Sequence, residues 1–93
     1  MSWLATESSL ASVPSDVISQ IEDVLDHFIG TLGTSVNLQA LVSAVLAGLA
    51  GGAPGIIASV IANLATILPT VGVAERELVK LGLEMVEKVL ARQ

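Results

Sequence analysis

The sequence contains few side chains that could carry out chemistry. His27 is the only histidine, and Asp23 precedes it by one helical turn, so a helix would place a carboxylate and an imidazole on one face. Such a pair is a base without a nucleophile, because Ser19 lies on the wrong side of this spacing to supply a hydroxyl. We therefore predict no catalytic residue, and we interpret His27 as an exposed side chain near a helix end.

The same search finds no ligand set. Glu22, Asp23 and Asp26 are close in sequence, but no loop of the calcium-binding kind surrounds them. The chain has no cysteine, which excludes disulfides and cysteine-ligated zinc. The glycines of residues 48–55 lack the preceding strand and the Lys-Ser/Thr ending of a phosphate-binding loop. We expect no metal, no cofactor and no enzyme activity, and we assign these glycines to a turn and to close helix packing.

The chain is organised around an uncharged segment instead. From Phe28 to Ala74 there is no Asp, Glu, Lys, Arg or His, and Gly51–Gly55 separates two apolar runs. This layout predicts a helical hairpin that must be hidden from water, by protein or by lipid.

Composition predicts more apolar surface than one small monomer can conceal. The 93 residues are 53% hydrophobic, and the mean hydropathy is +0.80. A chain of this length buries only about 60% of its unfolded surface. We therefore expect self-association, a protein partner or a bilayer.

Charge excludes several other partners. The net charge is -5, and all four basic residues lie between Arg76 and Arg92. Nucleic-acid binding and attraction to anionic lipids are not expected without a basic patch. Residues 1–4 lack the positive start of a secretory signal peptide, and Glu7 interrupts the first apolar run. These features favour the cytoplasm or a virion over export, with a membrane location left open.

Periodicity predicts an all-α fold. Residues 1–14 form an N-terminal arm, which is either loosely held or docks Trp3 on a neighbouring subunit. Residues 15–93 form a single helical domain, either bundle-like or interlocked with neighbours in an oligomer. Its four expected helices, of which the middle two make the hairpin, are Ser15–Leu32, Leu38–Ala50 (capped by Ser35 or Asn37), Pro54–Leu68 and Glu75–Ala91.

The helix faces differ in character. The first helix places its acidic residues, including Glu22, opposite one apolar stripe; this face is either solvated or docks basic residues of another subunit. Both hairpin helices have a large apolar face and a small, weakly polar one. The last helix is expected to cover the core with an inner stripe of Leu78, Val79, Gly82, Met85, Val86 and Val89, widened by Leu81, Leu83 and Leu90.

These features favour a non-enzymatic structural subunit that self-associates into a shell, filament or virion component. Small residues let helix backbones of neighbouring copies approach closely. The predicted interface consists of the one tryptophan and the small residues of the hairpin: Trp3, Ala44, Ala47, Gly48, Ala58, Ala62 and Ala65.

Two alternatives are retained. One is a membrane-embedded hairpin, since the second run just reaches the roughly 20 residues that a bilayer span needs. In size and layout such a chain resembles small two-span membrane proteins such as phage holins, a resemblance that implies a membrane-active role. The other is a soluble carrier of an apolar ligand, with the hairpin lining a cavity.

Overall fold

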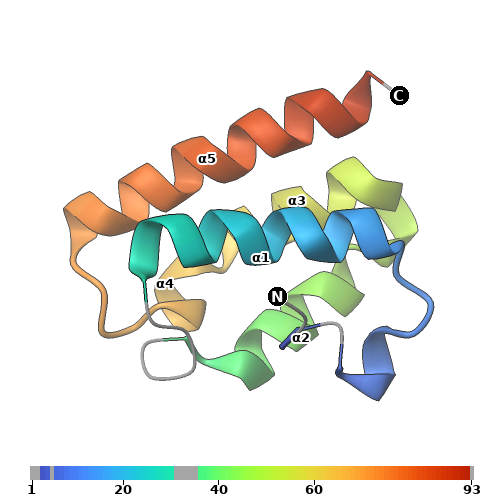
Figure 1. The fold of residues 1–93 in the computed structure, drawn as a ribbon, viewed down its shortest axis with the longest axis horizontal. Helices are drawn as coiled ribbons and strands as arrows, with labels where there is room; N and C mark the ends of the chain where they lie inside the picture. Colours follow the sequence, from blue (N-terminus) through green and yellow to red (C-terminus); the bar gives the residue numbers. More distant parts are fainter. Residues whose placement is uncertain (1–2, 5, 31–35, 93) are drawn as a thin grey trace.

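This computed structural model describes residues 3–4, 6–30 and 36–92, and most of them form helices. No strand occurs in those residues, which confirms the predicted all-α class (Figure 1). The elements are η1 (Ser8–Leu10), α1 (Ser15–Ile29), α2 (Leu38–Ala47), η2 (Leu49–Gly51), α3 (Gly52–Ala62), α4 (Leu64–Ile67) and α5 (Val73–Ala91), where η marks a short 3-10 helix.

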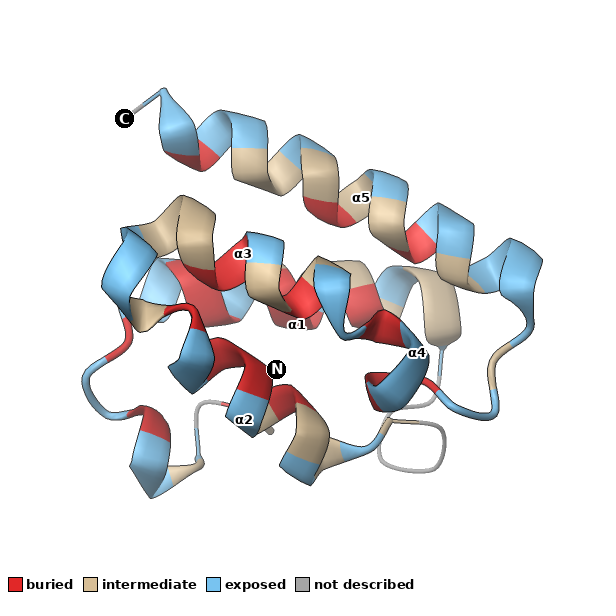
Figure 2. Cartoon of the chain, turned by 180° about the vertical axis from the view of Figure 1, so that it is seen from behind, coloured by how far each residue is buried: buried red, intermediate tan, exposed pale blue. Residues whose placement is uncertain are grey.

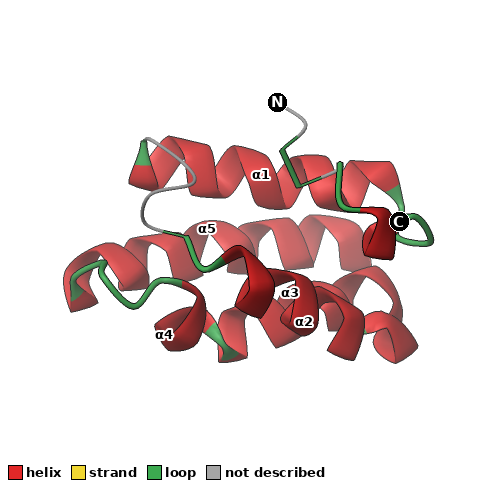
Figure 3. Cartoon of the chain, turned by 90° about the horizontal axis from the view of Figure 1, so that it is seen from below, coloured by secondary structure: helices red, strands yellow, loops and turns green. Residues whose placement is uncertain are grey.

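The described chain is compact on its own. Its radius of gyration is 11.8 Å, close to the roughly 12 Å expected for a folded domain of this length. The helix α5 runs along one edge of the molecule beside α1 and α3 (Figure 1). Seen from below, short loops connect the helices of the described chain (Figure 3).

The predicted helix boundaries shift where the backbone leaves the helical conformation. The first helix ends at Ile29 because Gly30 adopts a φ of 83°, which favours glycine. The predicted end at Leu32 lies outside the described residues, as does the alternative cap Ser35. Asn37 is the cap of α2, and its Oδ1 accepts a hydrogen bond from the Ala40 N–H at 3.1 Å.

Each predicted hairpin helix is interrupted near one end. The first becomes α2 and the 3-10 turn η2, and the second divides at Asn63 into α3 and α4. Gly48 lies where the two runs cross: a Cβ there would stand 2.5 Å from the Gly55 carbonyl oxygen and 2.6 Å from Ile56 Cα. Glycine at position 48 is therefore what lets the two backbones approach so closely.

The apolar faces of the hairpin form the core. Leu41, Val45, Ile57 and Val60 have no exposed surface. In Figure 2 the buried parts of α2 and α3 lie in the interior of the molecule, and the exposed side of α5 lies on its outer edge. The hairpin is thus largely covered by its own chain.

The N-terminal arm is part of this cover rather than loosely held. Leu4 and Leu10 are buried, and η1 packs against α2. The Leu4 N–H donates a hydrogen bond of 2.9 Å to Glu22 Oε2. Glu22 is only 1% exposed, so its predicted place on the solvated face is wrong: the arm lies over it.

The predicted inner stripe of α5 is only partly right. Val79, Leu83 and Leu90 are buried and Gly82 and Val86 are half-buried, whereas Leu78, Leu81, Met85 and Val89 are exposed. The helix is rotated toward Leu83 and Leu90 relative to the expectation. Apolar residues cover more than half of its circumference, so the positions of α1 and α3, and not the local pattern, decide which of them are buried.

Candidate functional site

The residues that come nearest to a catalytic pair do not form one in this fold. His27 is exposed, and its ring meets Phe28 edge-on at a centroid distance of 4.8 Å. Within the described ranges, no group of three or more histidine, aspartate or glutamate side chains could hold a metal ion. The structure therefore directs attention to surfaces rather than to a chemical centre.

The predicted interface residues divide into two groups. Ala47, Ala58, Ala62 and Ala65 are exposed on the hairpin. Two others serve the chain's own packing: Ala44 is 4% exposed, and Gly48 lies against the backbone of α3. The use of the exposed alanines between copies stays a prediction.

Trp3 lies against the chain's own core. It is partly buried and packs beside the buried residues of the arm and the helices. Its indole Nε1 is buried without a hydrogen-bond partner among the described residues. The predicted docking of Trp3 on a neighbour would therefore require it to leave this position, and it stays a prediction.

The exposed small residues of the hairpin make an uncharged outer surface. A hollow of about 270 Å³ lies where α2 approaches the junction of α3 and α4, and it is lined by Ala40, Ser43, Ala44, Ala47, Asn63 and Thr66. We define the hairpin outer face as Ser43, Ala47, Ala58, Ala62, Ala65 and Thr66, all of which are exposed. This face presents small side chains and no charge to the surroundings.

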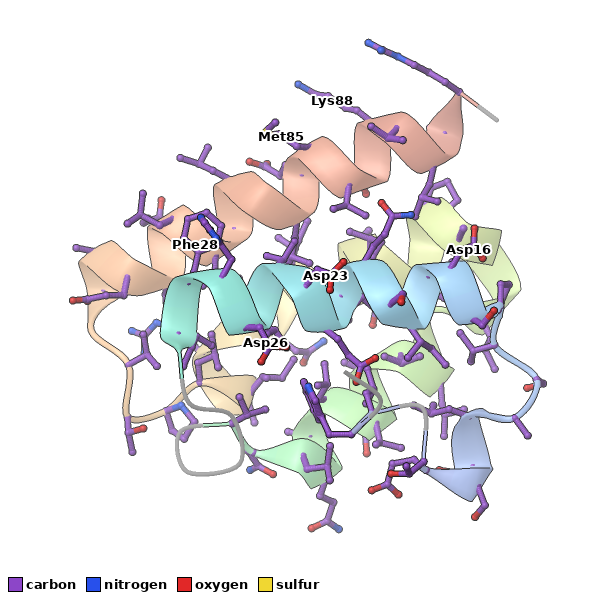
Figure 4. All side chains as sticks on the ribbon, in the orientation of Figure 1. Asp16, Asp23, Asp26, Phe28, Met85 and Lys88 are labelled. Carbon is purple, nitrogen blue, oxygen red and sulfur yellow. The ribbon has the colours of Figure 1, made fainter. Side chains whose placement is uncertain are left out.

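A second apolar surface lies on α5. Four large side chains are 48–69% exposed there; this set, called the α5 stripe below, is Leu78 (50%), Leu81 (57%), Met85 (69%) and Val89 (48%). Their spacing of three and four residues places them on one side of the helix. Met85 points away from the body of the molecule, as does the neighbouring Lys88 (Figure 4).

The width of the apolar arc is the signal that could have revealed this stripe. Both Val79 and Leu81 are apolar, although they lie on different sides of the helix. A helix that only covers a core needs one apolar stripe, with polar residues opposite. The excess on α5 indicates two apolar faces, one for the core and one left exposed.

The two long helices differ in charge: α1 carries acidic residues and neither Lys nor Arg, whereas α5 carries charges of both signs. Asp16 and Asp23 are exposed on α1, and Asp26 is half-buried (Figure 4). The four basic residues lie on or just after α5. One of them has a structural role: Arg76 Nη1 donates to the carbonyl oxygens of Leu68 at 3.2 Å and Val71 at 3.0 Å, which fixes the connection from α4 to α5.

The hairpin has one property of a membrane segment. Over the described residues, no single helix is both long and apolar enough to cross a bilayer. One pair of helical segments, Leu38–Ala47 and Leu49–Ala62, meets the length and composition only when taken together, with a bend of 45° between them.

Comparison of the sequence and the structure with known proteins found no match. No family model matches the chain, and neither the curated proteins nor the solved structures include a match. The functional argument therefore depends on the surfaces described above.

Proposed function

We propose that this chain is a non-enzymatic structural subunit that self-associates into a larger protein assembly, such as a shell, a filament or a virion component. One observation carries the proposal: a compact chain exposes two uncharged surfaces, the large apolar side chains of the α5 stripe and the small side chains of the hairpin outer face. Exposed apolar surface of this kind is typical of protein contacts.

Two surfaces support an assembly better than one does. A single self-complementary surface closes a two-fold dimer, and the dimer then stops growing. A second surface on each subunit links such dimers to further copies. The two faces belong to different elements, α5 and the hairpin, and they adjoin where Ala62 and Ala65 share a hollow with Glu77.

The character of the hairpin outer face supports contact between helices. Ala58, Ala62 and Ala65 present small side chains, which allow another helix to pack at short distance. The hollow beside Ala47 provides a recess into which a larger side chain of a neighbour would insert. The hairpin itself carries no charge, since residues 36–74 contain none; Arg76, Glu77 and Lys80 of α5 border Ala62 and Ala65 at the edge of this face.

The test is the size of the protein in the absence of detergent. The chain is expressed, separated from membranes by ultracentrifugation, and measured by light scattering and sedimentation velocity. We expect a soluble species of many chains. A soluble monomer at all concentrations would refute the proposal.

A matched pair of substitutions locates the contact. Ala62→Leu places a large side chain on the hairpin outer face, whereas Ala91→Leu does so at the exposed end of α5. Overfilling a close contact costs about 1–3 kcal/mol, so we expect Ala62→Leu alone to reduce the size of the assembly. If the two variants assemble equally, the hairpin outer face is not a contact.

A second candidate is a membrane-embedded hairpin. It is favoured by the bent pair of segments whose combined length and composition suit a bilayer. In that state the hairpin would have to leave the cover that α1, α5 and the arm provide. Complete partition into the membrane fraction, with release only by detergent, would replace the assembly proposal with this one.

A further inference from the structure

One border of the α5 stripe carries an acidic residue near the start of the helix and a basic residue near its end. With 100° between successive residues, Glu77 and Lys88 fall on this border, with Glu84 between them. A half-turn about an axis perpendicular to the middle of the helix would therefore bring Glu77 of one copy beside Lys88 of another.

We infer that a second copy of this chain covers the α5 stripe, with the two α5 helices antiparallel about a two-fold axis. This inference rests on the proposed function, because it identifies one of the contacts of the assembly. A surface that meets its own copy across a two-fold axis must be self-complementary. The α5 stripe satisfies that condition in its apolar residues and in the pairing of Glu77 with Lys88 on one border.

The antiparallel arrangement determines which residues meet. Near the axis, Leu81 of one copy packs against Met85 of the other, and the reverse contact is equivalent. Farther out, Glu77 of one copy faces Lys88 of the other, again twice. A parallel arrangement would instead turn Glu77 toward the opposite border of the other copy, where Glu75 and Gly82 lie, and would leave Lys88 without an acidic partner across the contact.

The size of the stripe indicates a reversible contact. From Leu78 to Val89 the helix advances about 17 Å. A standard interface buries about 800 Å² on each partner, or roughly a sixth of the 5002 Å² that this chain exposes. Contact between two single helices lies at the lower end of the size range. We therefore expect pairing through α5 to depend on protein concentration and to be reinforced in an assembly by the hairpin outer face.

The first experiment compares two substitutions at equally exposed positions. Met85 and Val73 are both 69% exposed, but only Met85 belongs to the stripe. Sedimentation velocity over a range of concentrations gives the dissociation constant of the smallest paired species. We expect Met85→Glu to raise it by about 30-fold or more, the effect of losing a central contact residue. Val73→Glu should leave it unchanged, and far-UV circular dichroism verifies that both variants are folded.

A charge exchange tests the orientation. In the antiparallel pair, Glu77→Lys and Lys88→Glu each create like-charge contacts and weaken pairing, and the double variant restores it. In a parallel pair residues 77 and 88 face the opposite border of the other copy and do not meet, so neither substitution is expected to rescue the other.

Disulfide trapping provides an independent measure of the same geometry, because the chain contains no native cysteine. A mixture of the Leu78→Cys and Val89→Cys variants should form the mixed disulfide dimer on oxidation, with little of either homodimer. Predominant homodimers would overturn the antiparallel arrangement.

The outcomes separate this inference from the proposed function. If the parent chain forms a large soluble assembly and Met85→Glu forms the same assembly with unchanged affinity, the α5 contact is refuted and the proposed function stands. If the parent chain is a monomer throughout, both are refuted. The antiparallel contact is supported by two results together. Met85→Glu gives a smaller folded species, and the Glu77→Lys, Lys88→Glu double variant regains the parent size that each single variant loses.

Discussion

Gly48→Ala tests the close crossing of the two hairpin runs. The added Cβ would lie 2.5 Å from the Gly55 carbonyl oxygen and 2.6 Å from Ile56 Cα. Both neighbours are backbone atoms at the start of α3, so neither can move aside as a flexible side chain would. The substitution must therefore push α2 and α3 apart or distort the turn between them.

The structure also provides a control for the intrinsic effect of alanine. Gly48 has φ -91° and ψ -1°, and Gly51 has φ -89° and ψ 5°, so the two backbone conformations nearly coincide. A Cβ at Gly51, however, would have no atom within 4 Å. Comparison of Gly48→Ala with Gly51→Ala therefore isolates the cost of the close approach.

The two substitutions are expected to change the free energy of unfolding in opposite directions. Alanine at an unstrained glycine position raises the free energy of unfolding by about 0.4–1 kcal/mol, because the unfolded chain becomes less flexible. That gain is the whole expectation for Gly51→Ala. For Gly48→Ala, overpacking costs about 1–3 kcal/mol; we expect the upper part of this range, since backbone atoms are involved. The net result is a loss of about 2 kcal/mol.

Thermal and urea unfolding measure this difference. A change of 1 kcal/mol shifts the melting temperature of a chain of this size by about 4–8 °C. We therefore expect Gly48→Ala to melt roughly 8–16 °C below the parent, and Gly51→Ala at or slightly above it. All three proteins must be compared at one concentration, because association changes the apparent stability. If Gly48→Ala were as stable as Gly51→Ala, the hairpin runs would not cross at Gly48 in the way described.

Three further substitutions test the other devices that hold the fold. Asn37→Ala should lower the free energy of unfolding by about 0.5–2 kcal/mol through loss of the α2 cap, and Asn37→Asp should retain most of it in the same urea titration. Glu22→Ala leaves the Leu4 N–H without its buried acceptor, so we expect a loss of about 1–3 kcal/mol and faster hydrogen exchange at Leu4; no effect at either readout would show that the arm is held by other contacts. Gly82→Ala should change stability by less than about 1 kcal/mol, because the helix propensity of alanine offsets the shift required of Phe28; a large loss would mean that Phe28 cannot move.

The sequence predicts the elements of this fold better than their orientation. The cap at Asn37 and the apolar faces of the hairpin are local patterns, and the structure agrees with both. The periodicity of α1 likewise predicts its buried stripe. Such features depend on residues within one or two turns of each other, so a single sequence is sufficient to find them.

The errors arise where distant segments decide the outcome. Glu22 lies at the edge of the apolar stripe of α1, and only the position of the arm determines that it is buried. The rotation of α5 depends in the same way on α1 and α3. The candidate surfaces also differ in this way. The small face with the exposed alanines at 58, 62 and 65 was predicted from the local pattern, whereas the exposure of Met85 was not predicted.

The order of the elements along the chain has a consequence for biosynthesis. The helix that packs most extensively against α3 is α5, which follows the hairpin in the sequence. During translation the apolar hairpin is therefore synthesised before the helix that covers it. At about 5–20 residues per second, the 19 residues of α5 take roughly 1–4 s to add. For that interval α5 is not yet available to cover the apolar face of α3.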